Sequence, residues 1–144
     1  GFFTHYENTS YNVIPYIEGK KKQVFILTAP TNPGVILLGN DYLLHYSKKL
    51  KFKKKEKIHN TLIPLPIMDD EGNESVSSVH SHVNSELIDP TDICTLLLYR
   101  DYVNWEQHIV IGRKYVSIFN IKKATLGVLT LEAWKRIGEE GRGR

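Results

Sequence analysis

The chain has a single cysteine among its 144 residues, which excludes an internal disulfide and a cysteine-rich metal cluster. Cys94 has apolar neighbours and is expected to be a small buried residue. Long hydrophobic runs are also missing, because no apolar stretch approaches the ~20 residues that a membrane span requires. The first residues lack the charged and apolar regions of a signal peptide. The sequence therefore predicts no membrane-spanning segment.

The composition and length are those of one folded domain over residues 1–144. Apolar residues make up 41% of the chain, which is enough for a hydrophobic core. No internal repeat, low-complexity linker or compositional break divides the sequence. The chain starts at Gly1 without an initiator methionine, so we expect it to be the C-terminal or an excised part of a longer polypeptide. Compartment and oligomeric state are left open.

The excess of positive charge, +3 in total, lies in two places: the lysine-rich run 48–55 and the tail 142–144. Such a run can bind nucleic acid or another anionic surface by neutralising phosphates. It can equally be an edge strand, where lysine discourages pairing with other chains. The edge strand is the favoured interpretation.

Alternation and turn residues predict a mixed α/β fold, of the α+β mixed-sheet kind, in which helices cover at least one face of the strands. The helix signal is clearest at Asp89, an expected N-cap followed by Pro90 and by Asp92 in the first turn. A terminal helix is expected to begin after Thr130 and to stop at Gly138. The expected strands are 11–18, 23–29, 34–39, 60–68, 75–82, 108–112 and 115–121, with 60–68 at an edge because of its two prolines and 41–50 left undecided.

His80 and His82 stand two residues apart in the predicted strand 75–82, so their imidazoles face the same side, roughly 7 Å apart at Cα. Asp92 follows His82 by ten residues, which allows a loop to bring the first turn of the helix back beside them. Two imidazoles and one carboxylate are a donor set that zinc accepts, with a water as fourth ligand in a catalytic site. Water on such a metal becomes a nucleophile near neutral pH.

Each of these residues also has a plainer explanation. Two histidines on an exposed strand are usually polar surface, and Asp92 at the third helical position stabilises the helix N-terminus by roughly 0.3 to 1 kcal/mol. The conjunction of the three is more informative than its parts. The sequence therefore predicts a zinc site formed by His80, His82 and Asp92.

The stretch SVHSH (78–82), a loop, DPTDI (89–93) and the two strands after them resemble the core of the JAMM (JAB/MPN) metalloprotease superfamily. The family pattern is His-Ser/Thr-His-Pro, a spacer and Ser-x-x-Asp. The resemblance implies a JAMM/cytidine-deaminase-like core and zinc on the two histidines and the aspartate. It also implies a glutamate on an earlier strand that activates water, and a protein or peptide substrate. Members remove ubiquitin-like tags, process sulfur-carrier or phage-tail proteins, or form the toxin tips of bacterial secreted proteins; this chain is most similar to the short, divergent bacterial versions.

Three positions depart from the family pattern. Val83 stands in place of the proline, Asp89 stands in place of the serine, and Asn32 lies where the resemblance implies the glutamate. An asparagine side chain cannot accept a proton from water. Without a general base, the reaction would lose the rate enhancement of about 10² to 10⁴-fold that general-base catalysis provides. Glu18 or Asp89 is expected to move the proton instead. Without one of them, the chain would be a catalytically silent protein-binding module.

A third possibility is a basic effector that binds nucleic acid through 48–55 and the tail, with His80 and His82 as acid and base. It is disfavoured because Phe52 is the only ring in the basic run. Trp105 and Trp134 are expected to pack in or beside the core. His108 could be a hydrogen-bond partner of a metal ligand, but exposed polar surface is the favoured interpretation.

Overall fold

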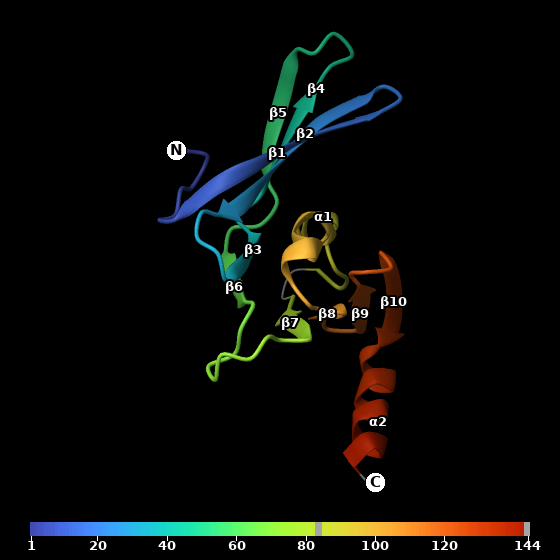
Figure 1. Cartoon of the computed structure of the whole chain (residues 1–144). Coiled ribbons are helices and arrows are strands. Elements are labelled where there is room, and N and C mark those ends of the chain that lie inside the picture. The colour runs from blue at the N-terminus through green and yellow to red at the C-terminus, as the bar shows by residue number, and fades with distance from the viewer. Residues whose placement is uncertain (83–84, 143–144) are drawn as a thin grey trace. The chain divides into compact units, whose positions relative to one another are not determined.

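The computed structural model describes residues 1–82 and 85–142. The chain divides into two compact units, Gly1–Ile67 (unit 1) and Met68–Arg144 (unit 2). The described residues form ten strands in three sheets, two α-helices and one 3-10 turn (Figure 1). The fold is thus mixed α+β, as predicted. Val83 and the last two residues of the basic tail, Gly143 and Arg144, lie outside the described residues. The expectation of one domain over 1–144 stays a prediction.

The larger sheet of unit 1 is antiparallel. It has the order β1 (Thr9–Glu18), β2 (Lys21–Pro30), β4 (Tyr42–Tyr46) and β5 (Phe52–Lys57). The lysine-rich run thus contributes β5, an edge strand, as the sequence predicts. The undecided segment 41–50 becomes β4 and the turn after it.

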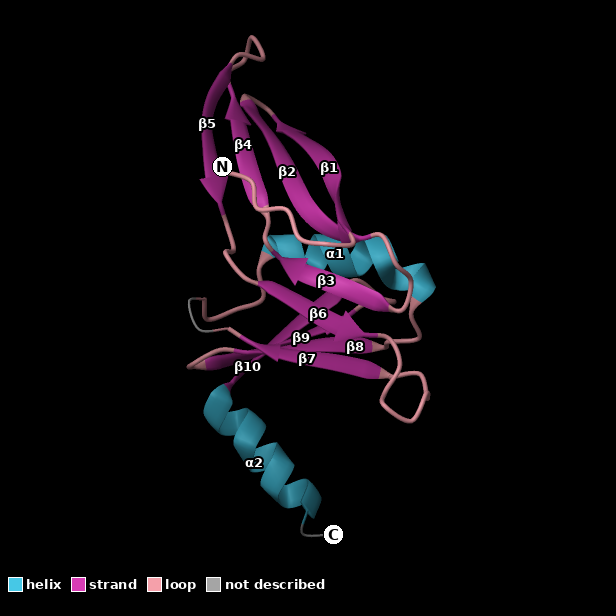
Figure 2. Cartoon of the chain, turned by 90° about the vertical axis from the view of Figure 1, so that its left-hand side faces the viewer, coloured by secondary structure: helices cyan, strands magenta, loops and turns pink. Residues whose placement is uncertain are grey.

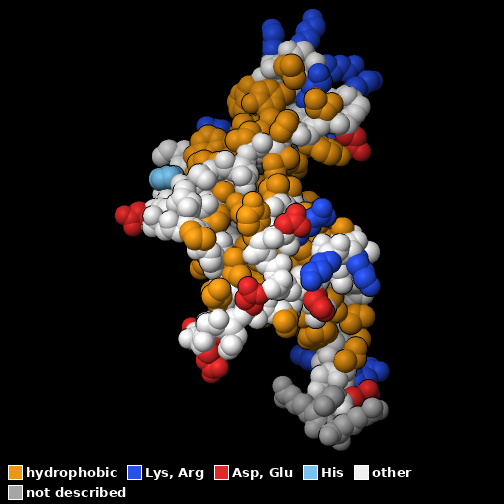
Figure 3. All heavy atoms as spheres, in the orientation of Figure 1, with side chains coloured by type: hydrophobic (Ala, Val, Ile, Leu, Met, Phe, Trp, Pro, Cys, Tyr) orange, Lys and Arg blue, Asp and Glu red, His pale blue; other side chains and the backbone are white. Residues whose placement is uncertain are grey.

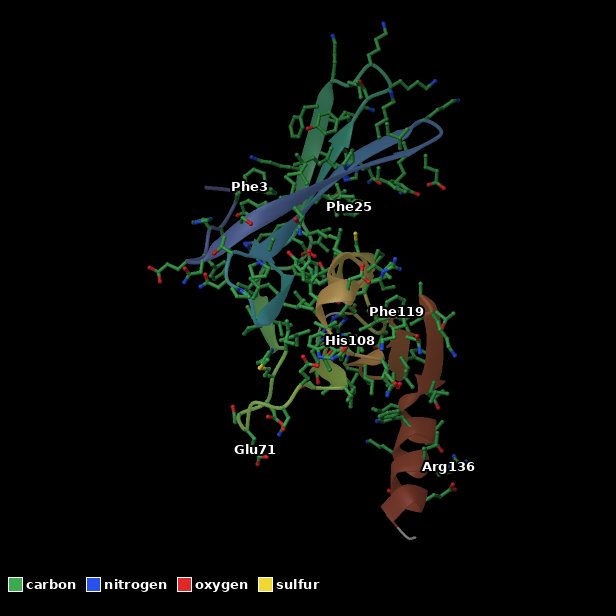
Figure 4. All side chains as sticks on the ribbon, viewed as in Figure 1. Phe3, Phe25, Glu71, His108, Phe119 and Arg136 are labelled. Carbon is green, nitrogen blue, oxygen red and sulfur yellow. The ribbon has the colours of Figure 1, made fainter. Side chains whose placement is uncertain are left out.

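Aromatic side chains pack against one face of this sheet. Tyr42 is fully buried, and the ring of Phe3 lies 4.8 Å from its ring, centroid to centroid. Phe25 belongs to the other face, where its ring contacts Tyr16 at 6.3 Å (Figure 4). The rest of unit 1 is a two-stranded sheet of β3 (Val35–Gly39) and β6 (Leu62–Pro66), so the proline-containing segment is an edge strand, as predicted.

Unit 2 has one sheet of four strands. Its order is β10 (Thr125–Thr130), β9 (Tyr115–Asn120), β8 (Gln107–Ile111) and β7 (Ser77–Ser81). β7 and β8 are parallel and the other pairs are antiparallel. A parallel pair needs a crossover, and α1 (Pro90–Tyr99) with the 3-10 turn η1 (Arg100–Tyr102) provides it. The sequence failed to predict β10, which pairs along the whole of β9.

Two helices complete unit 2. α1 begins directly after Asp89, whose φ and ψ of −84° and 150° are those of an N-cap, as predicted. α2 (Leu131–Arg142) extends from the end of β10 (Figure 2), and the hydroxyl of Thr130 accepts the N–H of Ala133 at 3.1 Å. The predicted stop at Gly138 is wrong, because a glycine inside a helix costs only about 1 kcal/mol and the helix continues through it. No helix in the described part of the chain is long and apolar enough to cross a membrane.

Candidate metal centre

The parallel pairing of β7 with β8 gathers three histidines on one face of the unit 2 sheet. The register places Ser78 opposite His108, two residues before His80. Residues paired across a sheet point to the same face, and alternate residues of a strand share it. His82 extends this row past the end of β7, since its backbone N–H donates to the carbonyl of Ile111 at 2.9 Å. The predicted common face of the two histidines is thus confirmed.

Asp92, in the first turn of α1, brings its carboxylate to the same two histidines. The Nε2 atoms of His80 and His82 lie 2.7 Å apart. The Oδ2 atom of Asp92 lies 3.1 Å from His82 Nε2 and 3.6 Å from His80 Nε2. The three residues, two buried and one half-buried, form a group that could hold a metal ion.

The Asp92 carboxylate is an unusual group to bury. The residue is 2% exposed, and its Oδ2 atom has no hydrogen-bond partner among the described residues, despite the two nearby nitrogens. Burial raises the pKa of Asp92, but the imidazoles of His80 and His82 offset burial and hold the pKa below its usual range. The carboxylate is therefore ionised at neutral pH. A buried carboxylate is stable only beside positive charge, which either a protonated imidazole of this pair or a metal ion bound between the three side chains would supply.

The loop after β7 fixes the ring of His82. Its Nδ1 atom lies 3.0 Å from the carbonyl oxygen of Leu87 and also contacts the hydroxyl of Ser85. A carbonyl oxygen only accepts hydrogen bonds, so Nδ1 carries the proton and donates it. The lone pair of neutral His82 is consequently on Nε2, the atom that faces Asp92. The Asp92 carboxylate raises the pKa of His82, against the effect of partial burial.

A hydrogen-bonded chain behind His80 holds the second ring. His80 Nδ1 lies 2.8 Å from His108 Nε2, and His108 Nδ1 lies 2.6 Å from the hydroxyl oxygen of Ser78. A cation on His80 Nε2 requires the lone pair there, so His80 then donates from Nδ1 to His108, and His108 donates to Ser78. Support of this kind behind a metal-binding histidine fixes its tautomer and raises its basicity.

His108 corrects the favoured sequence interpretation, which was exposed polar surface. The side chain is fully buried within unit 2, on β8 next to Phe119 of β9 (Figure 4). Burial, reinforced by the neighbouring His80, lowers the pKa of His108 to about 3. The ring is therefore neutral at physiological pH and can accept a hydrogen bond from His80. Its position agrees with the alternative, a partner of a metal ligand.

The loop 85–89 is itself anchored to the sheet. The Glu86 carboxylate accepts the backbone N–H of Lys114 at 2.8 Å, and the Ser117 hydroxyl accepts the buried N–H of Ile88 at 3.1 Å. The backbone of Glu86 also lies close to Gly112, the residue after β8, because a Cβ added to Gly112 would lie 2.5 Å from the carbonyl oxygen of Glu86. These contacts hold the Leu87 carbonyl within hydrogen-bonding distance of His82 Nδ1.

Gly112→Ala is therefore expected to push this loop away. A Cβ at 2.5 Å from a backbone oxygen forces a shift, which costs about 1–3 kcal/mol of unfolding free energy. Urea unfolding of the metal-free protein measures the loss. Gly127→Ala is the matched control, since its Cβ would meet its nearest neighbour at an ordinary 3.8 Å. Equal stability of the two variants would contradict this account of the loop.

The two predicted proton carriers lie in different units. Asp89 is the N-cap residue of α1, but its side chain makes no capping hydrogen bond. Its Oδ2 atom instead accepts the Ser85 hydroxyl at 3.2 Å and lies 3.5 Å from His82 Nδ1, whereas Asp92 faces the other ring nitrogen, Nε2. Glu18 is the last residue of β1 and is exposed, and Asn32 lies in the loop before β3, both in unit 1. The catalytic roles of Glu18 and Asp89 stay predictions.

The donor set fits an intermediate divalent cation. In a tetrahedral zinc site with bonds of about 2.0–2.1 Å, neighbouring ligand atoms are about 3.3 Å apart. The three separations here, 2.7, 3.1 and 3.6 Å, bracket that value. Three protein ligands leave a fourth position for water or substrate.

Sequence reasoning did not find Ser85 or the Leu87 carbonyl. Neither has a motif, because a backbone carbonyl is common to every residue and serine is common in loops. The signal that was present is the position of both residues between His82 and Asp89, inside the predicted site.

Comparisons with protein-family models, with curated proteins and with solved structures found no match to this chain.

Proposed function

We propose that this chain is a zinc-dependent peptidase or isopeptidase domain, with zinc on His80, His82 and Asp92. The observation that carries the proposal is the buried Asp92 Oδ2 atom, which has no hydrogen-bond partner among the described residues and faces the Nε2 atoms of both histidines. The similarity of SVHSH (78–82) and DPTDI (89–93) to the JAMM pattern supports the choice of zinc and of a protein or peptide substrate.

The residues of the chain have distinct tasks in this proposal. His82 presents its Nε2 lone pair because its Nδ1 proton is held by the Leu87 carbonyl. His80 does the same through His108. Asp92 supplies the negative charge that balances part of the cation. When bound, zinc supplies a Lewis acid that polarises a carbonyl and lowers the pKa of water to about 7.

Proton transfer is assigned to a carboxylate of this chain. Asp89 is one candidate, since its carboxylate lies near the candidate metal ligands, 3.5 Å from His82 Nδ1. Glu18 is the other. A carboxylate that accepts the proton of the attacking water and passes it to the leaving amine contributes about 10² to 10⁴-fold.

Metal content and turnover test the proposal together. We expect the purified protein to hold zinc in a one-to-one ratio, measured by elemental analysis, and His82→Ala to lose it because only two ligands remain. His5→Ala is the matched control, since His5 is exposed in unit 1. A chelator should lower the melting temperature, and added zinc should restore it. Absence of bound metal in the native protein, with no thermal response to zinc, would refute the site.

The second candidate is a silent module that keeps the metal as a structural element and binds a protein partner. The orientation of Asp89 favours it, because the carboxylate contacts His82 Nδ1 and so supports the ring rather than the fourth ligand position. Turnover of a general peptide substrate separates the two candidates. Zinc-dependent cleavage that is lost in His82→Ala supports the peptidase. Zinc-dependent stability without cleavage supports the silent module.

A further inference from the structure

One end of the larger unit 1 sheet carries seven lysines around exposed apolar side chains. Figure 3 shows basic and hydrophobic side chains gathered at this end. The lysines lie on the β1–β2 turn and the start of β2 (Lys20, Lys21 and Lys22) and on the β4–β5 turn and the start of β5 (Lys48, Lys49, Lys51 and Lys53). Glu18 is the only acidic residue in segments 16–22 and 46–53. We call this end of the sheet the lysine end.

The strand register brings the β1–β2 turn and the β4–β5 turn to the same end of the sheet. Ile17 pairs with Lys22, Lys22 pairs with Tyr46, and Tyr46 pairs with Phe52, so these four side chains form a row across one face of all four strands. The rings of Tyr46 and Phe52 are in contact, with centroids 6.0 Å apart. The row ends in two large apolar residues that water reaches, Ile17 at 67% exposure and Phe52 at 55%.

Leu50, at the tip of the β4–β5 turn, is both exposed and strained. Its φ is 60°, in the left-handed region that glycine or asparagine adopts more readily, and its side chain is 65% exposed. The conformation is held by the turn, since its N–H donates to the Ser47 carbonyl at 2.9 Å and Ser47 N–H donates to the Lys51 carbonyl at 2.8 Å. A strained, exposed leucine at a tip contributes little to folding. Outliers of this kind concentrate at functional positions.

We propose that the lysine end docks on an anionic lipid bilayer, with Leu50, Ile17 and Phe52 entering the headgroup region. Lysines near an anionic membrane surface are attracted to its lipids, and aromatic rings such as Phe52 and Tyr46 suit the interface between water and hydrocarbon. Aliphatic tips gain from burial at the boundary between the headgroups and the acyl chains. Ile17 and Leu50, the most exposed of the three, have no flat ring on which a base could stack, and the Phe52 ring already packs against Tyr46, so the surface suits a bilayer better than a single-stranded nucleic acid. The docking surface does not depend on the metal centre.

Vesicle co-sedimentation of the whole chain tests this surface. We expect binding to vesicles that contain phosphatidylglycerol, little binding to phosphatidylcholine alone, and a steep loss of binding as salt rises. Single-stranded DNA and RNA are assayed under the same conditions. Binding to nucleic acid without binding to anionic vesicles would overturn the proposal, as would equal binding to both kinds of vesicle.

Two variants separate charge from insertion. Replacing Lys48, Lys49 and Lys51 by glutamine should weaken vesicle binding about 100-fold, at about fivefold for each lysine. The matched control replaces Lys122, Lys123 and Lys135, three exposed lysines of unit 2, and should bind like the native protein. If the two triple variants lost vesicle binding equally, the net charge of the chain alone would explain the effect, and a specific docking surface would be refuted.

Leu50→Asn removes the apolar tip and suits the left-handed backbone. We expect vesicle binding to fall about tenfold while the melting temperature is unchanged or higher, because the strain is relieved. The stable variant therefore excludes misfolding as the cause of lost binding. Native-like binding by Leu50→Asn would show that the tip does not enter the bilayer.

Discussion

Asp92→Asn is expected to weaken zinc binding by at least about 100-fold. The carboxylate is the only anionic member of the ligand group, and even partners behind the ligands change metal affinity 10–100-fold when they are replaced. The asparagine amide has nearly the same shape, so the loss reflects charge and donor type rather than packing. Competition with a coloured chelator measures the affinity of the native protein and the variant.

The metal-free variant should remain folded, which makes the affinity loss interpretable. Where His82 is neutral, its Nε2 lone pair lies 3.1 Å from the buried Asp92 carboxylate in the native protein, whereas an amide N–H at residue 92 can donate to that nitrogen. We therefore expect the chelator-treated variant to melt at or above the temperature of the chelator-treated native protein. Native zinc affinity in Asp92→Asn would refute the ligand assignment.

His108→Ala is expected to weaken zinc binding about 10–100-fold without removing a ligand. The variant leaves His80 Nδ1 without the acceptor that holds its ring, and it opens a cavity beside β9. The unfolding free energy of the metal-free protein should also fall, by about 1–3 kcal/mol for the lost hydrogen bonds. His108 is a positioning residue in this account, since it reaches the metal group only through His80.

Two measurements distinguish positioning from simple destabilisation. His108→Gln offers a side-chain carbonyl that can accept the hydrogen bond from His80 Nδ1, so we expect it to recover most of the zinc affinity. The visible absorption spectrum of the cobalt-substituted protein reports ligand geometry directly, and it should change in His108→Ala and return towards native in His108→Gln. An unchanged cobalt spectrum in His108→Ala would assign His108 to the core alone.

The sequence was most informative where short-range geometry decides the structure. The strand period puts His80 and His82 on one face without any knowledge of the fold, and Asp89 with Pro90 marks the start of α1 in the correct place. The ten-residue spacing then brings Asp92 to the histidines because the loop returns to the strand it left. All three predicted ligands consequently meet in the structure.

The supporting residues could not be predicted because they depend on strand pairing. His108 is buried only because β8 runs parallel to β7 and puts it opposite Ser78, a register that hydrophobic periodicity does not contain. β10 was missed for a related reason, since Thr125–Thr130 contains a glycine and only its pairing with β9 makes it a strand. Gly138 led to the wrong helix end because a single glycine does not terminate a helix when the residues after it remain helical, as they do in α2.

The crossover from β7 through α1 to β8 keeps the whole metal centre close together along the chain. The ligands and their supports, from Ser78 to Ser117, belong to one contiguous stretch of unit 2. Closing a short loop costs little chain entropy, so the ligand loop between His82 and Asp92 can form early in folding. Under the proposed metal binding, the cation would join the end of β7 to the first turn of α1, so that binding energy would also be folding energy for unit 2.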